Sequence, residues 1–150
     1  MCEENGVLTG LWFEGSRDEA RHSDDCRVVK CKTLSLVCRW LDEYFAGSSP
    51  DRLPPMRLDG ATPFRSMVSE EMLRIPFGKT VTYGDIAKRI ASKIGKSRMS
   101  AQAVGGAVGW NPICIIIPCH RVIGADGKLT GYGGGLKNKI ALLKHEGVEL

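Results

Sequence analysis

The sequence predicts an α/β protein whose N-terminal part contains sheet and whose C-terminal part is mainly helical, and three observations lead to this fold class. Val7–Phe13 is rich in β-branched and aromatic residues and stops at Glu14-Gly15, which is typical of a strand. Several later stretches carry apolar residues three and four positions apart, the spacing of one face of a helix. Ile113–Ile117 is a β-branched run of the length expected for a buried strand.

The helices are predicted from apolar spacing and from residues that begin or end helices. The first starts near Thr33, presents Val37, Trp40 and Tyr44 on one face, and stops at Gly47. Two later helices begin with a Thr-Pro pair and with a Thr-x-x-Asp capping box. The later predicted helices cover residues 62–75, 82–94, 100–108 and 136–146.

A proline-rich segment is predicted to divide the chain into two parts. Residues 1–60 form a shortened N-terminal α/β domain that ends in a linker at 47–60, and residues 61–150 form the second domain. The first part holds 8 Lys and Arg against 11 Asp and Glu, whereas the second holds 13 against 6. A basic part joined to an acidic one indicates that the basic part binds a polyanion, although an ordinary basic surface would give the same count.

The composition excludes several classes of protein. With 43% hydrophobic and 25% charged residues and no biased tract, the chain is neither disordered nor fibrous. Its longest apolar run is too short for a membrane span, and its acidic first residues lack the order of a signal peptide. We therefore expect a soluble, cytosolic protein that does not contact membranes.

The six cysteines are expected to be reduced thiols, because the chain has no export signal and no C-x-x-C pair. A zinc site is an open alternative, although its spacing matches no standard ligand pattern. Its ligands would be His22, Cys26, Cys31 and Cys38.

Residues 82–108 have the pattern of a helix-turn-helix. The predicted turn is the basic Lys96-Ser97-Arg98, and the second helix contains the small residues Ala103 and Gly105. Small residues let a helix backbone approach a DNA groove closely. A plain αα-hairpin shows the same pattern, but the positive charge of this part favours DNA.

Cys119 is the candidate for covalent chemistry. It follows the predicted buried strand, where the chain leaves the core, and lies beside His120 and Arg121, which would lower the pKa of a thiol. Glu146 is the candidate for a third group that orients the histidine. Because adjacent side chains in an extended chain point in opposite directions, the pair needs a turn at 118–120 or a bridging water. The alternative is that Cys119 is an ordinary buried thiol. Gly131–Gly135 is predicted to be a mobile flap, because it lacks the G-x-G-x-x-G spacing of a dinucleotide-binding loop.

Several motifs, in order along the chain, resemble the O6-alkylguanine-DNA alkyltransferases. They are Ala103–Gly106, Asn111-Pro112 and, above all, Ile-Pro-Cys-His-Arg-Val at 117–122. The resemblance runs from about Thr62 to Gly147, and Leu8–Gly15 is similar to the N-terminal domain of that family. It implies a small ribonuclease-H-like sheet domain followed by a mainly helical, winged helix-turn-helix-like domain.

The resemblance also implies an activity, namely DNA repair by direct alkyl transfer. A cysteine thiolate would take the alkyl group from guanine O6, with thymine O4 as a second candidate, in a base flipped out of duplex DNA. The reaction would be irreversible and happen once per molecule. It implies a monomer with no metal and no cofactor, located in the cytoplasm and on the nucleoid when bound to DNA.

Roles follow by position from the same resemblance. Cys119 is the acceptor, His120 is its base through a water, and Glu146 orients His120. Tyr83 donates a proton to the leaving guanine, and Asn111 stabilises the active-site loop. The expected pocket residues are Trp110, Val122, Tyr132, Gly133 and Gly134. The expected DNA-binding residues are Tyr83, Gly84, Ser97, Arg98, Gln102, Ala103, Gly105, Arg65 and Arg121.

The sequence departs from the family pattern in three places. Gln102 stands where the family has an intercalating arginine, which predicts weaker base flipping or binding. An opening strand pair of the N-terminal domain is expected to be missing, and Trp110 either caps the base pocket or only packs. The alternative function is a lesion-recognising DNA-binding module of the alkyltransferase-like type, which lacks the acceptor cysteine.

Overall fold

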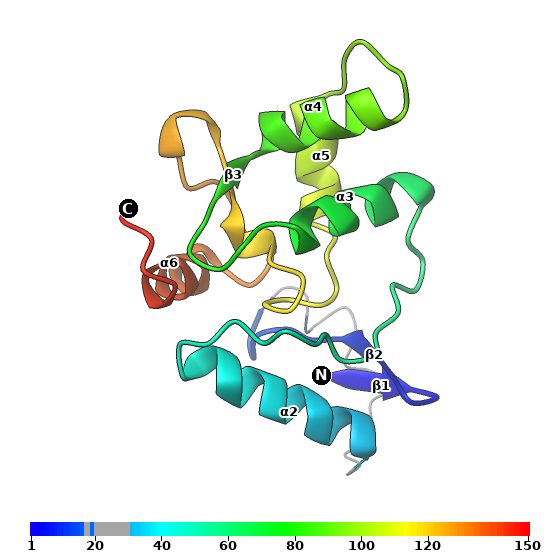
Figure 1. Cartoon of the computed structure of the whole chain (residues 1–150), viewed down its shortest axis with the longest axis vertical. Helices are drawn as coiled ribbons and strands as arrows, with labels where there is room; N and C mark the ends of the chain where they lie inside the picture. Colours follow the sequence, from blue (N-terminus) through cyan, green and yellow to red (C-terminus); the bar gives the residue numbers. More distant parts are fainter. Residues whose placement is uncertain (17–18, 20–30) are drawn as a thin grey trace.

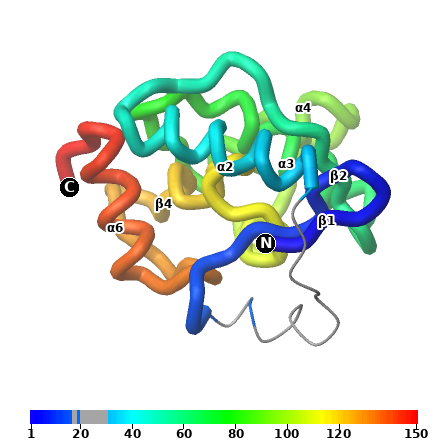
Figure 2. The backbone as a smooth tube through the Cα atoms, turned by 90° about the horizontal axis from the view of Figure 1, so that it is seen from below, coloured from blue at the N-terminus to red at the C-terminus, as the bar shows by residue number. Residues whose placement is uncertain are grey.

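The computed structural model describes residues 1–16, 19 and 31–150 and confirms the α/β fold class. Strands β1 (Cys2–Glu4) and β2 (Val7–Gly10) and helix α2 (Lys32–Phe45) lie at one end of the molecule. Helices α3 (Pro63–Leu73), α4 (Tyr83–Lys93) and α5 (Ala101–Val108) lie toward the other end (Figure 1). The first, yellow part of the segment that leads from α5 to α6 (Leu136–His145) runs between these two ends. Seen from below, α2, α6 and the N-terminal residues surround this yellow segment (Figure 2).

The N-terminal sheet is an antiparallel hairpin of β1 (Cys2–Glu4) and β2 (Val7–Gly10). Its turn is Asn5-Gly6, in which both residues have positive φ, as expected for a two-residue hairpin turn. The predicted linker continues this sheet, because the amide of Leu8 donates to the carbonyl of Pro55 at 2.8 Å. The strand predicted over 7–13 is therefore shorter than expected, and the described residues show a hairpin rather than a complete ribonuclease-H-like sheet.

Helix α2 (Lys32–Phe45) confirms the first predicted helix. Its buried side includes Val37, Trp40 and Tyr44, and the last two rings stack with their centroids 5.6 Å apart. The helix-turn-helix pattern also appears, in α4 (Tyr83–Lys93) and α5 (Ala101–Val108), with α3 (Pro63–Leu73) packed against them. Their N-caps are Thr62, Thr82 and Ser100.

The strand predicted at Ile113–Ile117 is wrong. The segment is buried, but it folds into a tight turn in which Ile115 has φ of 69°, and only Ile113 bridges to Leu11. The run predicts burial correctly, but it cannot distinguish a strand from a packed turn. The chain continues into a short 3₁₀ turn, Cys119–Arg121, and then into β4 (Val122–Ile123), which pairs in parallel with β3 (Val81–Thr82).

Asp126 and Gly127 lie in a 3₁₀ turn, Ala125–Gly127, that no antiparallel strand pair flanks in the described structure. Helix α6 (Leu136–His145) confirms the final predicted helix. One hydrophobic core joins residues from both predicted parts, including Leu8, Val37, Ile86 and Leu142. The division near residue 60 stays a prediction. Among the described residues, no helix combines the length and apolarity of a membrane span.

The expectation of reduced thiols is wrong for Cys2, which is disulfide-bonded. Cys2 lies half-buried on β1, which is paired on one side only, with β2. The free thiols of the described residues are Cys31, Cys38, Cys114 and Cys119. The zinc alternative also needs His22 and Cys26, which lie outside the described residues. Within the part of the chain that the structure describes, no His, Cys, Asp and Glu cluster could hold a metal ion.

Candidate active site

Asn111 organises the turn that carries Cys119. Its side-chain oxygen accepts from the amide of Ile113 at 3.0 Å, and its Nδ2 donates to the carbonyls of Ile113 and Ile117 at 3.2 and 2.9 Å. The same Nδ2 lies 2.9 Å from Sγ of Cys119. Asn111 therefore supplies the hydrogen bonds that a sheet would otherwise give this buried backbone. The same side chain contacts both the turn and the sulfur of Cys119.

Cys119 is buried, with 4% of its surface exposed, so the expectation of a thiol exposed at the end of a strand is wrong. The turn around Asn111 folds the sulfur inward. Hydrogen bonds from Cys114 and Asn111 lower the pKa of the Cys119 thiol, against the effect of burial. Lys139 of α6 adds a smaller effect in the same direction. This environment favours the thiolate, which is the nucleophilic form of cysteine.

Glu146, the C-cap of α6, is the centre of a buried hydrogen-bond network. Its Oε1 lies 2.7 Å from Nε2 of His120 and accepts from the Tyr44 hydroxyl at 2.7 Å. Its Oε2 accepts from the amide of Gly78 at 3.0 Å. Burial alone would raise the pKa of Glu146, but the hydrogen bonds from His120 and Arg121 outweigh it and hold the pKa at about 2.

His120 is fully buried, and its contact with Glu146 fixes its tautomer. The ionised carboxylate can only accept, so Nε2 carries the proton and Nδ1 is left as a bare acceptor. Nδ1 is buried and has no hydrogen-bond partner among the described residues. Burial lowers the pKa of His120 below its usual value, more than Glu146 raises it, so the ring is a neutral base near pH 7.

Arg121, which was predicted to bind DNA, turns its guanidinium into the interior. Arg121 is 8% exposed and donates from Nε to Oε2 of Glu146 at 2.9 Å and from Nη1 to the carbonyl of Ile75 at 2.7 Å. A short 3₁₀ turn beside a buried carboxylate places this side chain inside, where it compensates the charge of Glu146.

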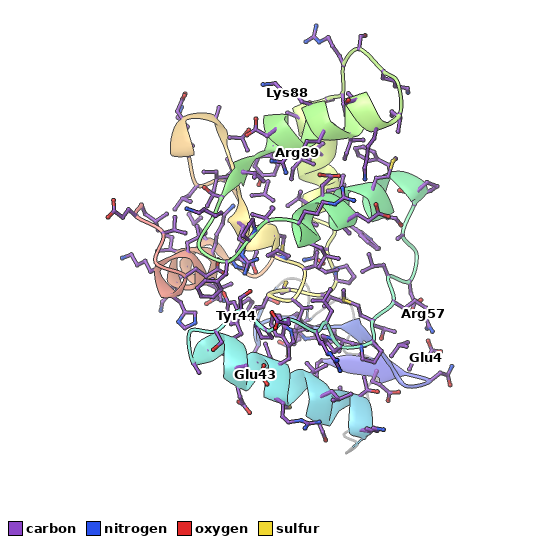
Figure 3. All side chains as sticks on the ribbon, viewed as in Figure 1. Glu4, Glu43, Tyr44, Arg57, Lys88 and Arg89 are labelled. Carbon is purple, nitrogen blue, oxygen red and sulfur yellow. The ribbon has the colours of Figure 1, made fainter. Side chains whose placement is uncertain are left out.

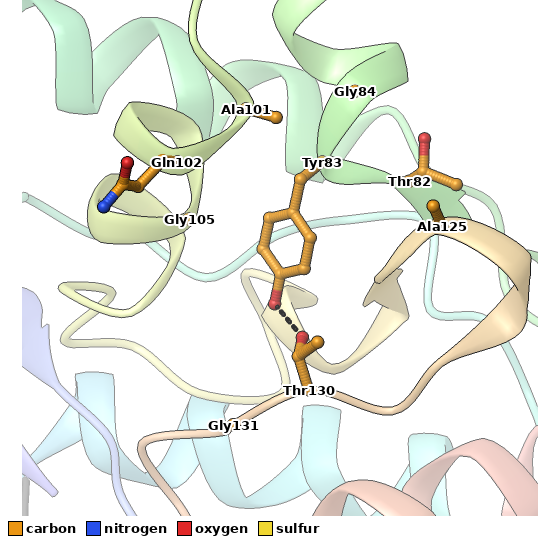
Figure 4. A pocket seen from close by; sticks show the side chains of 9 residues that line it. All are labelled: Thr82, Tyr83, Gly84, Ala101, Gln102, Gly105, Ala125, Thr130 and Gly131. Atoms are coloured by element: carbon orange, nitrogen blue, oxygen red, sulfur yellow. Dashed lines mark hydrogen bonds between the residues drawn. The ribbon is translucent and has the colours of Figure 1, made fainter.

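Tyr83 and several predicted DNA-binding residues line one cavity of about 560 Å³. Tyr83 stands at the first position of α4, and its hydroxyl accepts from Oγ1 of Thr130 at 2.9 Å (Figure 4). Gly84, Gln102 and Gly105 line the same cavity from α4 and α5, and Gly131 closes it from the opposite side. Ala103 is exposed on α5 but is not part of this lining.

The remaining predicted DNA contacts lie on two neighbouring surfaces. Ser97 and Arg98 line a second cavity of about 630 Å³ beside the turn between α4 and α5, together with Lys88 and Lys96. Arg65 instead places its guanidinium over the ring of Trp110, 4.6 Å from the centroid, in a cation–π contact. Trp110 is therefore only partly exposed and covered on one side.

The predicted glycine flap packs against the N-terminal part of the chain. The rings of Tyr132 and Phe13 meet edge to face at 6.3 Å, and a Cβ on Gly134 would lie 2.6 Å from the Phe13 ring. Gly133 is half-buried and Val122 fully buried. Burial raises the pKa of Tyr132, as does the nearby Cys119, so the Tyr132 hydroxyl stays protonated beside the sulfur. The flap thus packs against Phe13 in this structure.

Three buried residues were not predicted to take part in the site: Tyr44, Cys114 and Lys139. Lys139 is fully buried, and its Nζ donates to the carbonyl of Val122 at 2.6 Å. Its position three residues after Leu136 and four before Leu143, on the apolar side of α6, was a usable signal. Tyr44 was predicted only as a core residue, because helical spacing gives burial but not the distant partner of a hydroxyl.

Acid should destabilise the protein by protonating the buried network around Glu146. The pKa of Glu146 lies below its ordinary value of 4.5, so its contribution of about 3 kcal/mol is complete above pH 4.5 and declines toward pH 2. The lowered pKa of His120 acts in the same direction below its ordinary 6.5, because the unfolded chain binds that proton first. Urea unfolding at several pH values should therefore show stability falling steadily with acid. A constant midpoint between about pH 6 and about pH 3 would contradict this.

The family model for the DNA-binding domain of 6-O-methylguanine DNA methyltransferase matches residues 63–148. The chain belongs to this family. A methylated-DNA–protein-cysteine methyltransferase of Mycobacterium bovis is 50% identical over 106 residues, which are 71% of this chain and 61% of that protein. The chain thus spans about three fifths of the length of the first curated relatives that it matches.

Other members of the 6-O-methylguanine DNA methyltransferase family match over nearly the whole chain. The Salmonella typhimurium methyltransferase is 44% identical over 98% of this chain and 87% of its own length. A crystal structure of Mycobacterium tuberculosis OGT in complex with DNA has a TM-score of 0.80 at 41% identity, covering 97% of this chain and 83% of that one. Fold and sequence therefore agree in placing the chain in this family.

Proposed function

We propose that this protein repairs DNA by taking the alkyl group from O6-alkylguanine in duplex DNA onto the sulfur of Cys119. The observation that carries the proposal is a thiol whose pKa is lowered by Cys114 and Asn111, adjacent in the chain to a histidine that a buried Glu146 orients. A thiolate is a soft, weakly hydrated nucleophile, which suits attack on an alkyl carbon. The names of the relatives support methyl transfer from DNA to a cysteine. Thymine O4 is the second substrate that we propose.

The proton transfers follow from the hydrogen-bond directions. A water between Nδ1 of His120 and the sulfur of Cys119 would carry the thiol proton to the ring, and Glu146 would stabilise the imidazolium. The sulfur–carbon bond then forms as the carbon–O6 bond breaks, and the departing guanine takes a proton from the Tyr83 hydroxyl. The Tyr83 phenolate regains a proton from solvent and the His120 imidazolium releases one, so that the net change moves one proton from the thiol to guanine. The thioether is stable, so each molecule reacts once, with no cofactor.

The target base must leave the duplex, because a buried sulfur cannot reach O6 in a stacked base. The cavity between α4, α5 and Thr130 is the proposed entry, with α5 in the groove and the basic groups near Arg98 on phosphates. The glycine flap around Tyr132 would have to move as the base enters. We place this activity on the nucleoid, in the cytoplasm, and propose that a monomer suffices.

A guanine methylated at O6 inside a restriction site gives a direct test. The protein should restore cleavage of such a duplex, and the number of restored sites should equal the number of protein molecules. Tight binding of the methylated duplex without restoration would overturn the proposal and favour the lesion-recognising module. Turnover beyond one site per molecule would overturn the single-use mechanism.

Gln102→Arg should react faster with methylated duplex than the natural protein. Gln102 is exposed on α5 and lines the cavity beside Tyr83 (Figure 4). A planar cation could stack in the gap that the flipped base leaves, which predicts a single-turnover rate about threefold higher or more. Gln102→Lys is the matched control, since it adds a positive charge without the planar guanidinium group of arginine. Equal single-turnover rates for Gln102→Arg and the natural protein would show that residue 102 does not fill the gap.

A further inference from the structure

The hydroxyl of Tyr44 connects the N-terminal helix α2 to the carboxylate at the centre of the active site. Tyr44 is fully buried on the side of α2 that faces the rest of the molecule (Figure 3). It donates to Oε1 of Glu146 at 2.7 Å, across 102 residues of sequence. The same oxygen lies 2.7 Å from Nε2 of His120, so the tyrosine and the base share one acceptor atom.

Sharing an acceptor has an electrostatic consequence. Each donor to Oε1 draws on the negative charge that would otherwise stabilise a protonated His120. Burial and the hydrogen bond to Glu146 raise the pKa of Tyr44, so its hydroxyl remains a donor at every pH at which the protein is folded. Tyr44 therefore weakens the hold of the Glu146–His120 pair on a proton by a constant amount.

The packing of the ring does not require the hydroxyl. Tyr44 stacks on Trp40, and the rings of Phe45 and Phe77 meet it edge to face at 5.2 and 5.7 Å. A phenylalanine would make the same ring contacts. What the hydroxyl adds is the bond to Glu146, which takes part in the charge balance of the site.

The other charged and titratable groups in this environment come from two elements. Arg121 and Cys119 lie with His120 on the 3₁₀ turn, and Arg121 binds both oxygens of Glu146. Lys139 and His145 lie on α6, and Nε2 of His145 is 2.8 Å from the carbonyl oxygen of Tyr44. Tyr44→Phe changes none of these groups, so the effect of the hydroxyl can be isolated.

We propose that Tyr44 is a positioning residue of the alkyl transfer, through which α2 sets how strongly His120 holds a proton. The proposal deepens the proposed function and rests on it. The N-terminal part is then a component of the reactive site as well as a scaffold beside it. Removing the hydroxyl should leave more charge for His120, and the neutral, basic form of the ring should then require a higher pH.

The test is the pH profile of two reactions in the full chain and in Tyr44→Phe. The first is single-turnover methyl transfer from a duplex that contains O6-methylguanine. The second is alkylation of Cys119 by iodoacetamide, followed by peptide mass so that the other cysteines do not interfere. In both reactions the rate falls at low pH, and Tyr44→Phe should move this acid limb of the pH–rate profile to higher pH by about half a unit or more. The rate on the high-pH plateau should stay within about twofold of that of the natural protein.

Two further variants separate the hydroxyl from the packing. Phe45→Leu removes a ring contact to Tyr44 from a half-exposed residue and should leave the acid limb in place. Difluorotyrosine at position 44 is a stronger donor and should move the limb downward, which also tests the inference if Tyr44→Phe fails to fold. An unmoved limb in both position-44 variants, or a rate that falls equally at every pH, would overturn it. Absence of methyl transfer with a Tyr44-dependent iodoacetamide profile would overturn the proposed function instead.

Discussion

Cys119→Ser should lose methyl transfer, with a single-turnover rate at least about a thousandfold below that of the natural protein. A serine hydroxyl ionises far less readily than a thiol, and its oxygen is a harder, more strongly hydrated nucleophile. The hydrogen bonds from Cys114 and Asn111 that favour the thiolate cannot offset that difference. The measurement is the rate at about pH 7 on a duplex with one O6-methylguanine.

Cys38→Ser is the matched control for this change. Cys38 is a free, exposed thiol on α2, so the same atom is exchanged away from the site. It should react at the rate of the natural protein, and Cys119→Ser should still bind the methylated duplex with unchanged affinity. A rate for Cys119→Ser within tenfold of the natural one would mean that another residue accepts the alkyl group.

Glu146→Gln should have the second largest effect, on stability and on rate together. The amide leaves Arg121 buried without a compensating charge and removes the negative charge from Oε1, which faces His120 and Tyr44. Breaking a buried ion pair in this way costs about 3–5 kcal/mol of unfolding free energy. Methyl transfer should fall about a hundredfold, since the imidazolium loses its stabilising charge.

Urea unfolding and single-turnover kinetics at the same temperature measure both effects. Glu149→Gln is the control, because it makes the same substitution on an exposed residue three positions later. It should change neither quantity. A Glu146→Gln protein as stable as the control would show that the network around Glu146 does not support the fold, and an unchanged rate would remove Glu146 from the mechanism.

Local signals in the sequence predict the helices well. The N-caps Thr62 and Thr82 and the apolar face that includes Val37 and Trp40 each depend on residues a few positions apart, which a single sequence displays. The cluster of Cys119, His120 and Glu146 was predicted too, from the residues beside Cys119 and from a resemblance that several motifs carry. The structure buries all three and bonds His120 to Glu146.

The errors have a common physical cause, which is that the hydrogen bonds of polar side chains do not show in the apolar pattern of a sequence. The strand predicted at Ile113–Ile117 is a turn because the Asn111 side chain bonds its backbone. Arginine and lysine are usually surface residues, yet Arg121 and Lys139 each donate to a buried carbonyl oxygen that only the folded chain brings close. Local patterns report which residues are apolar, whereas the partner of a buried polar group depends on tertiary packing.

The most direct test of the account is the mass of the peptide that contains Cys119 after incubation with an oligonucleotide duplex carrying O6-methylguanine. The account predicts one added methyl group on this peptide, located on Cys119 by fragmentation, and an equal loss of methylated guanine from the DNA. An unmodified Cys119 peptide from protein that binds the same duplex, or a methyl group on a different residue, would contradict it.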